Sequence, residues 1–133
     1  MDTASLIIEN ESSYSFELTV EKLSNAILAA GWKISTTHDL QATLLKHGKT
    51  VLPVKVIELC KPDHSAQLLE TDQYRYFSSL MPCRISVYEK SDGKTYISRL
   101  NSVFLAKQIG GLVKKVMSQA FYDAEEMIKP LIL

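Results

Sequence analysis

An Asp-Gly pair between two strand-forming segments constrains the fold of this chain more than any other feature. Residues 81–90 and 95–100 are rich in β-branched and aromatic side chains, and Asp92 and Gly93 lie between them. Both residue types tolerate the positive φ angles that a type I′ turn requires. The pair therefore predicts a β-hairpin with a two-residue loop.

The predicted turn also sets the register of the two strands. A two-residue loop pairs Val87 with Ser98 and Ile85 with Leu100. Because strand side chains alternate between faces, one face of the hairpin is expected to pack on helices. That face carries Cys83, Ile85, Val87 and Leu100. The opposite face carries Arg84, Ser86, Tyr88, Ile97 and Arg99.

Three residues of the second face form a candidate docking surface. Arg84, Tyr88 and Arg99 combine two positive charges with an aromatic ring. A solvated sheet face and a surface that binds a partner both explain this pattern, and the sequence leaves the two interpretations open.

Hydrophobic periodicity predicts the other elements in outline. Further strands are expected at residues 14–18, 32–37 and 51–60. Helices are expected at residues 19–30, with Thr19 as the cap, at 40–47, from 62 and at 73–80. A long C-terminal amphipathic helix is expected at residues 103–128. We expect residues 1–13 to be held loosely and the whole chain, residues 1–133, to form one domain.

Several single residues carry expectations of their own. Asp39 is expected to cap the short helix that follows it, with Leu40 and Leu44 facing inward. Trp32 is interpreted as an anchor of the core rather than of a ligand. The glycines at positions 110 and 111 disfavour an unbroken helix, so they predict either a kink or the close approach of another backbone.

The composition describes an ordinary globular chain and argues against several functional classes. The 133 residues are 46% hydrophobic, and 15 Lys and Arg balance 15 Asp and Glu. Zero net charge argues against nucleic acid as the main partner, because binding to phosphates uses a surplus of clustered positive charge. No apolar segment approaches the ~20 residues that span a membrane. Two cysteines and no visible secretory signal favour a reducing, cytoplasmic location.

Short motifs give the chain a family resemblance. Residues 80–89 read Leu-Met-Pro-Cys-Arg-Ile-Ser-Val-Tyr-Glu, and residues 58–62 read Glu-Leu-Cys-Lys-Pro. Together with His38-Asp39-Leu40 and the Leu44, Leu45 and Gly48 that follow, they resemble the ordered motifs of the domain-of-unknown-function 302 family. The resemblance covers roughly residues 14–128.

This resemblance implies a fold but no activity. The implied fold is a single α+β domain, mainly an antiparallel sheet with helices packed on one face, similar to the TATA-binding protein. It also implies dimers. Cys60, Pro82 and Cys83 match motif positions of the family, which assigns them no established role.

Cys60, His64 and Cys83 form a candidate thiol or metal site. Cys60 ends the third expected strand and Cys83 begins the fourth, so antiparallel pairing places both thiols at one end of the sheet. His64 follows in the first turn of a helix, whose N-terminus lowers the pKa of a nearby thiol. The three side chains could form a redox pair or bind a metal, whereas buried cysteines that only pack explain the same pattern. A fourth metal ligand would be Asp63, Glu58 or His38.

Two functional hypotheses follow. The first is a non-enzymatic homodimer that binds a small apolar or mixed ligand, or another protein, with a cavity between the sheet and the long helix. The second is a thiol-dependent redox or metal-binding protein that uses Cys60, His64 and Cys83. The sequence contains no nucleophile elbow and no phosphate-binding glycine loop, requires no cofactor and identifies no ligand.

Overall fold

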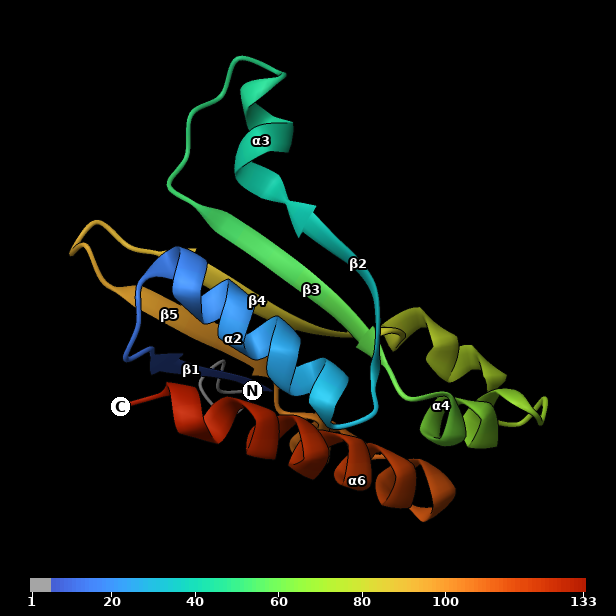
Figure 1. Cartoon of the computed structure of the whole chain (residues 1–133). Coiled ribbons are helices and arrows are strands. Elements are labelled where there is room, and N and C mark those ends of the chain that lie inside the picture. Colours follow the sequence, from blue (N-terminus) through green and yellow to red (C-terminus); the bar gives the residue numbers. More distant parts are fainter. Residues whose placement is uncertain (1–5) are drawn as a thin grey trace.

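Five antiparallel strands form the centre of the computed structural model, which describes residues 6–133 (Figure 1). The strands are β1 (Ile7–Glu11), β2 (Lys33–Asp39), β3 (Val54–Cys60), β4 (Cys83–Glu89) and β5 (Thr95–Leu100). Their order in the sheet is β1-β5-β4-β3-β2, and every neighbouring pair is antiparallel. The predicted fold class, an α+β domain with a mainly antiparallel sheet, is therefore confirmed.

Helices connect the strands and follow the last one. They are α2 (Phe16–Ala29), α3 (Leu40–Leu45), α4 (Pro62–Leu69), α5 (Ser102–Ala106) and α6 (Gly111–Ile128), with 3₁₀ helices η1 (Arg75–Leu80) and η2 (Lys129–Leu131). Across the part of the chain that the structure describes, none of the helices is long and apolar enough to cross a membrane.

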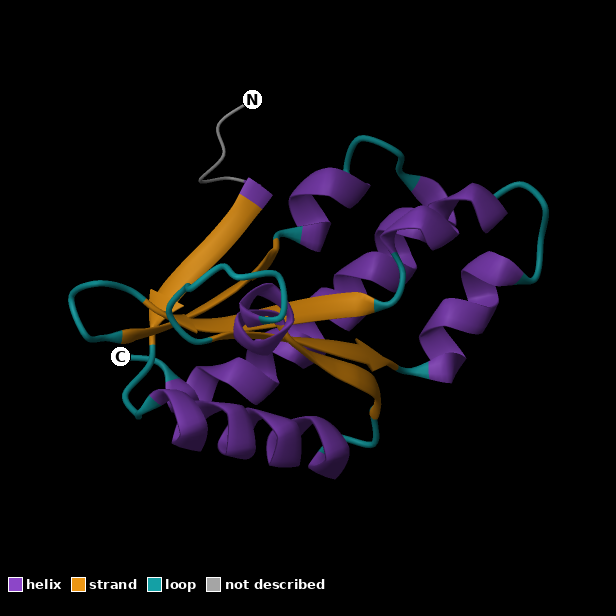
Figure 2. Cartoon of the chain, turned by 90° about the horizontal axis from the view of Figure 1, so that it is seen from above, coloured by secondary structure: helices purple, strands orange, loops and turns teal. Residues whose placement is uncertain are grey.

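Helix α2 lies along one face of the sheet, and α6 packs beside it (Figures 1 and 2). The main core lies between these helices and the inward side chains of β3, β4 and β5, and it includes Leu23, Ile27, Ile57, Leu59, Val87, Ile97 and Ile128. A second cluster packs α4, η1 and α5 against α6 through Leu68, Phe77, Ala106, Val113, Val116 and Met117.

The opposite sheet face, here the open face, carries side chains that are half-buried or exposed. Its members share the outward register positions of the three central strands: Val54, Val56, Glu58, Arg84, Ser86, Tyr88, Tyr96, Ser98 and Leu100.

The hairpin forms, but its loop has three residues rather than two. Lys90 N donates to Lys94 O at 3.1 Å, so Ser91, Asp92 and Gly93 make the turn. Among the described residues only glycines have positive φ, and Gly93 has φ of +80°. A type I′ turn would need positive φ at Asp92 as well, whereas a three-residue loop needs it only at the glycine.

The longer loop shifts the register by one residue, and the predicted faces of β5 were therefore wrong. Val87 pairs with Ile97 and Ile85 with Arg99. A one-residue shift moves every side chain of a strand to the other face. The inward face of β5 thus presents Ile97 and Arg99, while Leu100 lies on the open face. The assignments for β4 are confirmed, since Ile85 and Val87 are buried.

The start of the chain also differs from its prediction. Residues 7–11, expected to be loose, form edge strand β1, whereas the strand expected at residues 14–18 does not form; residues 1–5 lie outside the described part. Ser15 caps α2 by accepting from Leu18 N. Thr19, the expected cap, lies inside the helix, where its buried hydroxyl is 2.7 Å from Ser12 Oγ.

The expected C-terminal helix is broken near its start. Gly110 has φ of 75° and ψ of −166°, a conformation that glycine alone adopts readily, and Gly111 follows with φ of 58°. A Cβ added at either position would meet no atom of this chain within 4 Å, so the predicted kink, and not close approach within the chain, accounts for the two glycines. The break changes the direction of the chain, so that α5 packs against α6 in the second cluster.

Outcomes for the single residues are mixed. Asp39 caps α3 as predicted, accepting from Ala42 N at 2.9 Å. Leu40 and Leu44 were expected to face inward, but both are exposed because α3 projects beyond the sheet (Figure 1). Trp32 is buried in the main core.

Candidate functional site

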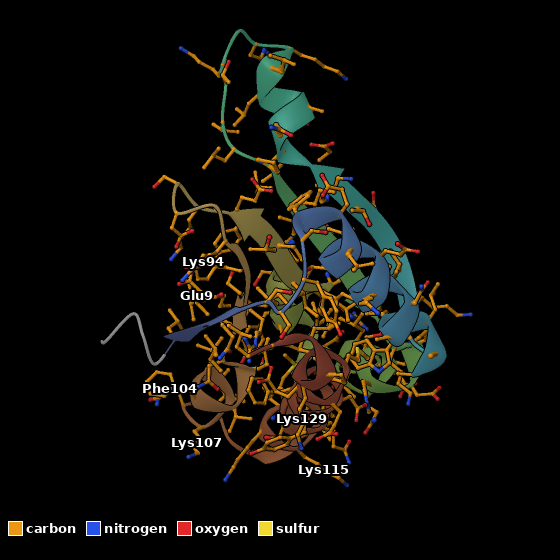
Figure 3. All side chains as sticks on the ribbon, turned by 60° about the vertical axis from the view of Figure 1, so that its left-hand side comes forward. Glu9, Lys94, Phe104, Lys107, Lys115 and Lys129 are labelled. Carbon is orange, nitrogen blue, oxygen red and sulfur yellow. The ribbon has the colours of Figure 1, made fainter. Side chains whose placement is uncertain are left out.

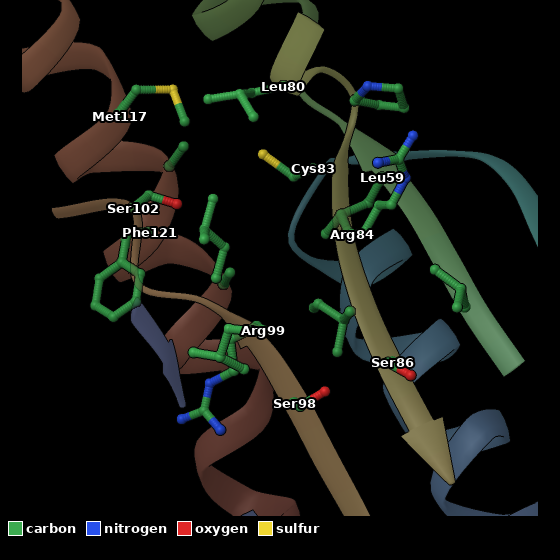
Figure 4. Close-up of a pocket in the computed structure, with 17 residues that line it drawn as sticks. Leu59, Leu80, Cys83, Arg84, Ser86, Ser98, Arg99, Ser102, Met117 and Phe121 are labelled. Atoms are coloured by element: carbon green, nitrogen blue, oxygen red, sulfur yellow. The ribbon is translucent and has the colours of Figure 1, made fainter. Parts of the chain in front are cut away.

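A cavity of about 340 Å³ lies where β4 and β5 separate, and we call it the fork cavity. Pairing between the two strands ends at Ile85 and Arg99, while β4 continues to Cys83 and β5 to Leu100. Helix α6 closes the space behind the two diverging strands (Figure 4). The open face of the sheet borders the other side.

Most of the fork cavity is apolar. Its apolar lining comprises Ile7, Val56, Leu59, Leu80, Pro82, Cys83, Ile85, Leu100, Met117, Ala120, Phe121 and Ala124. Its polar lining comprises Arg84, Ser86, Ser98, Arg99 and Ser102. The two sulfur-containing side chains, Cys83 and Met117, project into the space from opposite walls (Figure 4). No carboxylate belongs to the lining among the described residues.

Arg99 forms a buried ion pair at the wall of the fork cavity. Its Nε and Nη2 donate to the two carboxylate oxygens of Glu125 at 2.8 and 2.6 Å, and its Nη1 donates to Asn10 Oδ1 at 2.7 Å. Only 7% of Arg99 is exposed. The bidentate pair joins β5 to α6, and the hydrogen bond to Asn10 joins β5 to β1. Because Arg99 is buried in these contacts, it is not part of the predicted docking surface with Arg84 and Tyr88.

Arg84 lies on the open face at the mouth of the fork cavity. Its Nε is 3.5 Å from Glu58 Oε1, and the same oxygen is 2.7 Å from His38 Nε2. The hydrogen bond from His38 lowers the pKa of Glu58 below its ordinary value, and the charge of Arg84 adds to this effect. Arg84 itself is exposed.

A network of paired groups occupies the hairpin end of the open face. The Tyr88 hydroxyl donates to Glu9, which also accepts from Lys90 Nζ at 2.8 Å. Burial and the Glu9 carboxylate raise the pKa of Tyr88 to about 12. Figure 3 shows Glu9 and Lys94 in this region. Because these groups satisfy one another, they fasten β1 to the hairpin and leave little free chemistry there.

The three residues of the predicted thiol or metal site come together around a smaller cavity of about 30 Å³, beside Trp32. Cys60 Sγ is 3.4 Å from Ser65 Oγ. His64 Nε2 is 3.1 Å from Asp123 Oδ2, and the His64 ring meets Trp32 edge-on. Cys83 lines this cavity and the fork cavity, and both cysteines are free thiols.

One thiol of this cluster is a weaker acid than a free cysteine. Burial raises the pKa of Cys83 to about 11, and the nearby Cys60 contributes to this rise. Within residues 6–133, no three His, Cys, Asp or Glu side chains are arranged to hold a metal ion. His64 is instead oriented by Asp123, which joins α4 to α6.

The raised pKa predicts slow alkylation of Cys83. At neutral pH the reacting thiolate is a minor species, so the rate should rise with pH up to about 11. Iodoacetamide labelling followed by peptide mass analysis measures the rate at each cysteine. A Cys83 rate that levels off below pH 9 would contradict the buried, protonated thiol.

The sheet and its covering helices define a small α+β protein, with a mainly apolar cavity where β4 and β5 separate. The chain belongs to the DUF302 family, whose model, described as a domain of unknown function, matches residues 8–131. The chain is similar to a crystal structure of an uncharacterized conserved DUF302 protein from Bacillus stearothermophilus, with a TM-score of 0.82 and 17% identity. That match covers 93% of this chain and 96% of the other. No curated protein matches the sequence.

The sequence interpretation missed most of the fork cavity. Ser98, Ser102, Met117 and Phe121 were not singled out, and Glu125 was not recognised as the partner of Arg99. One signal was available. Ile97 and Arg99 are two residues apart in one strand, so they lie on the same face whichever register is chosen. That pattern shows that a buried Ile97 carries Arg99 inward with it.

Proposed function

We propose that this chain is a non-enzymatic module that binds a small, mainly apolar ligand in the fork cavity. The observation that carries the proposal is the chamber itself, about 340 Å³ with a largely apolar lining and a few polar groups at its mouth. Cavities of this size and character are typical of small-molecule sites. The proposal does not depend on Cys60 or His64, and it uses Cys83 only as lining.

Filling the fork cavity is expected to abolish this binding. In the variant Ala124→Leu, the added carbons enter the chamber from α6, where leucine is as compatible with the helix as alanine. We expect the wild-type chain to bind decanol saturably at one site, and the variant to bind at least about tenfold more weakly, because roughly two methylene contacts are lost. Isothermal titration calorimetry measures both affinities.

The matched control is Gln119→Leu, which adds an apolar side chain on the exposed side of α6. This control should bind decanol like the wild type. Equal binding by all three proteins, or none by the wild type at the solubility limit of decanol, would refute the proposal.

We also propose that the chain forms a homodimer through the hairpin end of the open face, around Val54 and away from the mouth of the fork cavity. Val54 pairs with Tyr88 and is not fully buried, so a second copy would remove apolar surface from water. The Val54→Lys variant should then be monomeric at micromolar concentration, whereas Thr43→Lys on α3 should not change the mass. Light scattering measures this, and a monomeric wild type would refute the proposed dimer.

A further inference from the structure

We infer that the ligand of the fork cavity is an amphiphile with one anionic group, a carboxylate on an unbranched apolar chain, and that Arg84 receives the carboxylate. This inference rests on the proposed function and goes further by naming the ligand class. It follows from the distribution of charge around the cavity, from the weak pairing of Arg84 and from the apolar interior.

The charges that line the fork cavity have one sign. Two guanidinium groups belong to the lining, and no Asp or Glu of the described residues does. The Arg99 charge is neutralised by the bidentate Glu125 and is turned toward α6 and β1. The remaining charge is that of Arg84, which favours an anion at the mouth.

Arg84 is loosely held by its protein partner. Its contact with Glu58 is a long one, 3.5 Å from Nε to Oε1, whereas the same carboxylate oxygen has a much closer partner in His38 at 2.7 Å. The exposed guanidinium can therefore donate to an added acceptor. A guanidinium binds a carboxylate through two parallel hydrogen bonds, which is the geometry that an exposed carboxylate group offers.

Two hydroxyls lie on the same sheet face as Arg84. Ser86 and Ser98 are direct cross-strand partners, and both line the fork cavity. Figure 4 shows the Arg84 guanidinium directed away from both of them. The serines therefore make the mouth polar without adding charge, and the charge that receives an anion is that of Arg84.

The interior admits no second charge. Beyond the mouth the apolar walls include Leu59, Met117 and Phe121 (Figure 4). The polar side chains there are the neutral Ser102 and Arg99, whose charge is already paired with Glu125. Burying a second charge against such walls would be strongly unfavourable. A volume of about 340 Å³ equals roughly eleven waters at ~30 Å³ each, which suits an unbranched chain of about ten carbons.

Three probes of equal length and different head groups test this inference. Decanoate, decanol and decyltrimethylammonium are titrated calorimetrically into the wild-type chain at low ionic strength. We expect decanoate to bind about tenfold more tightly than decanol, because it makes one additional charge-assisted hydrogen bond at a partly exposed site. Decyltrimethylammonium should bind more weakly than decanol, because its charge has the sign of Arg84.

Variants then test whether Arg84 causes the difference in affinity between decanoate and decanol. In Arg84→Gln the advantage of decanoate over decanol should disappear while decanol affinity is unchanged. The control Arg75→Gln alters an exposed arginine that pairs with Asp72 and does not line the fork cavity, and it should keep the advantage. A Ser86→Ala, Ser98→Ala double variant retains Arg84 and should keep the advantage of decanoate over decanol.

The outcomes separate this inference from the proposed function. Equal binding of decanoate and decanol, or a decanoate advantage that persists in Arg84→Gln, overturns the anionic ligand and leaves the apolar cavity site intact. Failure of all three probes to bind the wild type overturns both proposals.

Discussion

Replacing Arg99 by methionine is expected to lower the free energy of unfolding by about 3 kcal/mol. The substitution leaves Glu125 without the guanidinium that pairs with both of its oxygens, and it leaves the Asn10 side-chain oxygen without its donor. Breaking one partner of a buried ion pair costs ~3–5 kcal/mol. We expect the lower end of this range because the Glu125 side chain is still 26% exposed to solvent. Urea denaturation followed by circular dichroism measures the change.

The control for this prediction is the other arginine of the fork. Arg84→Met removes an exposed guanidinium whose contact with Glu58 is long, so it should cost less than about 1 kcal/mol. The double variant Arg99→Met, Glu125→Leu should recover most of the loss, since it removes the unpaired charge. A loss below 1 kcal/mol for Arg99→Met alone would mean that the ion pair does not join β5 to α6.

Replacing Trp32 by alanine is expected to cost about 3–5 kcal/mol of stability, the range for truncating a buried aromatic side chain. Trp32 is 3% exposed, packs in the main core and meets the His64 ring edge-on. Circular dichroism must follow unfolding, because Trp32 is the single tryptophan of the chain. Its removal also enlarges the small cavity beside Cys60 and Cys83.

Two further variants show what a smaller loss would mean. Tyr122→Ala truncates an exposed aromatic ring on α6 and should change the stability by less than about 1 kcal/mol. Trp32→Phe keeps much of the packing and should lose less than the alanine variant. If Trp32→Ala were as mild as Tyr122→Ala, the indole would be a surface or ligand-facing group rather than a core anchor.

Local signals in the sequence predicted local structure well. Asp39 as a cap and Pro62 as a helix start depend on a few neighbouring residues, and both occur where expected. The buried face of β4 was also predicted, because Ile85 and Val87 are the consistent apolar members of their strand.

The assignment of β5 side chains to the two sheet faces could not be predicted as reliably. The loop length depends on the φ angle of Asp92, and aspartate tolerates both turn types. The choice between them shifts the register by one residue, which moves Arg99 from one face to the other. A buried arginine also contradicts the usual preference of charged residues for water. Its partner Glu125 lies on a different element, so only the assembled fold reveals the compensation.

The fork cavity was predictable in its general location but not in its detail. A space between the sheet and the C-terminal helix follows from the layered α+β arrangement. Its lining depends on where β4 and β5 cease to pair, which periodicity does not detect, and on the helix break at Gly110, which the two glycines indicated as one of two alternatives. For the thiol cluster the location was predicted and the chemistry was not. Cys60, His64 and Cys83 line one small cavity as expected, but burial raises the pKa of Cys83 and keeps its thiol protonated.

The most direct test of the ligand site is a crystal structure of the chain with decanoate brominated at its terminal carbon. The anomalous signal of bromine locates the chain end independently of the head group. We predict one bromine site between Met117 and Phe121, with the carboxylate at Arg84. Bromine found elsewhere on the protein, or an empty fork cavity at saturating ligand, would contradict the proposed site.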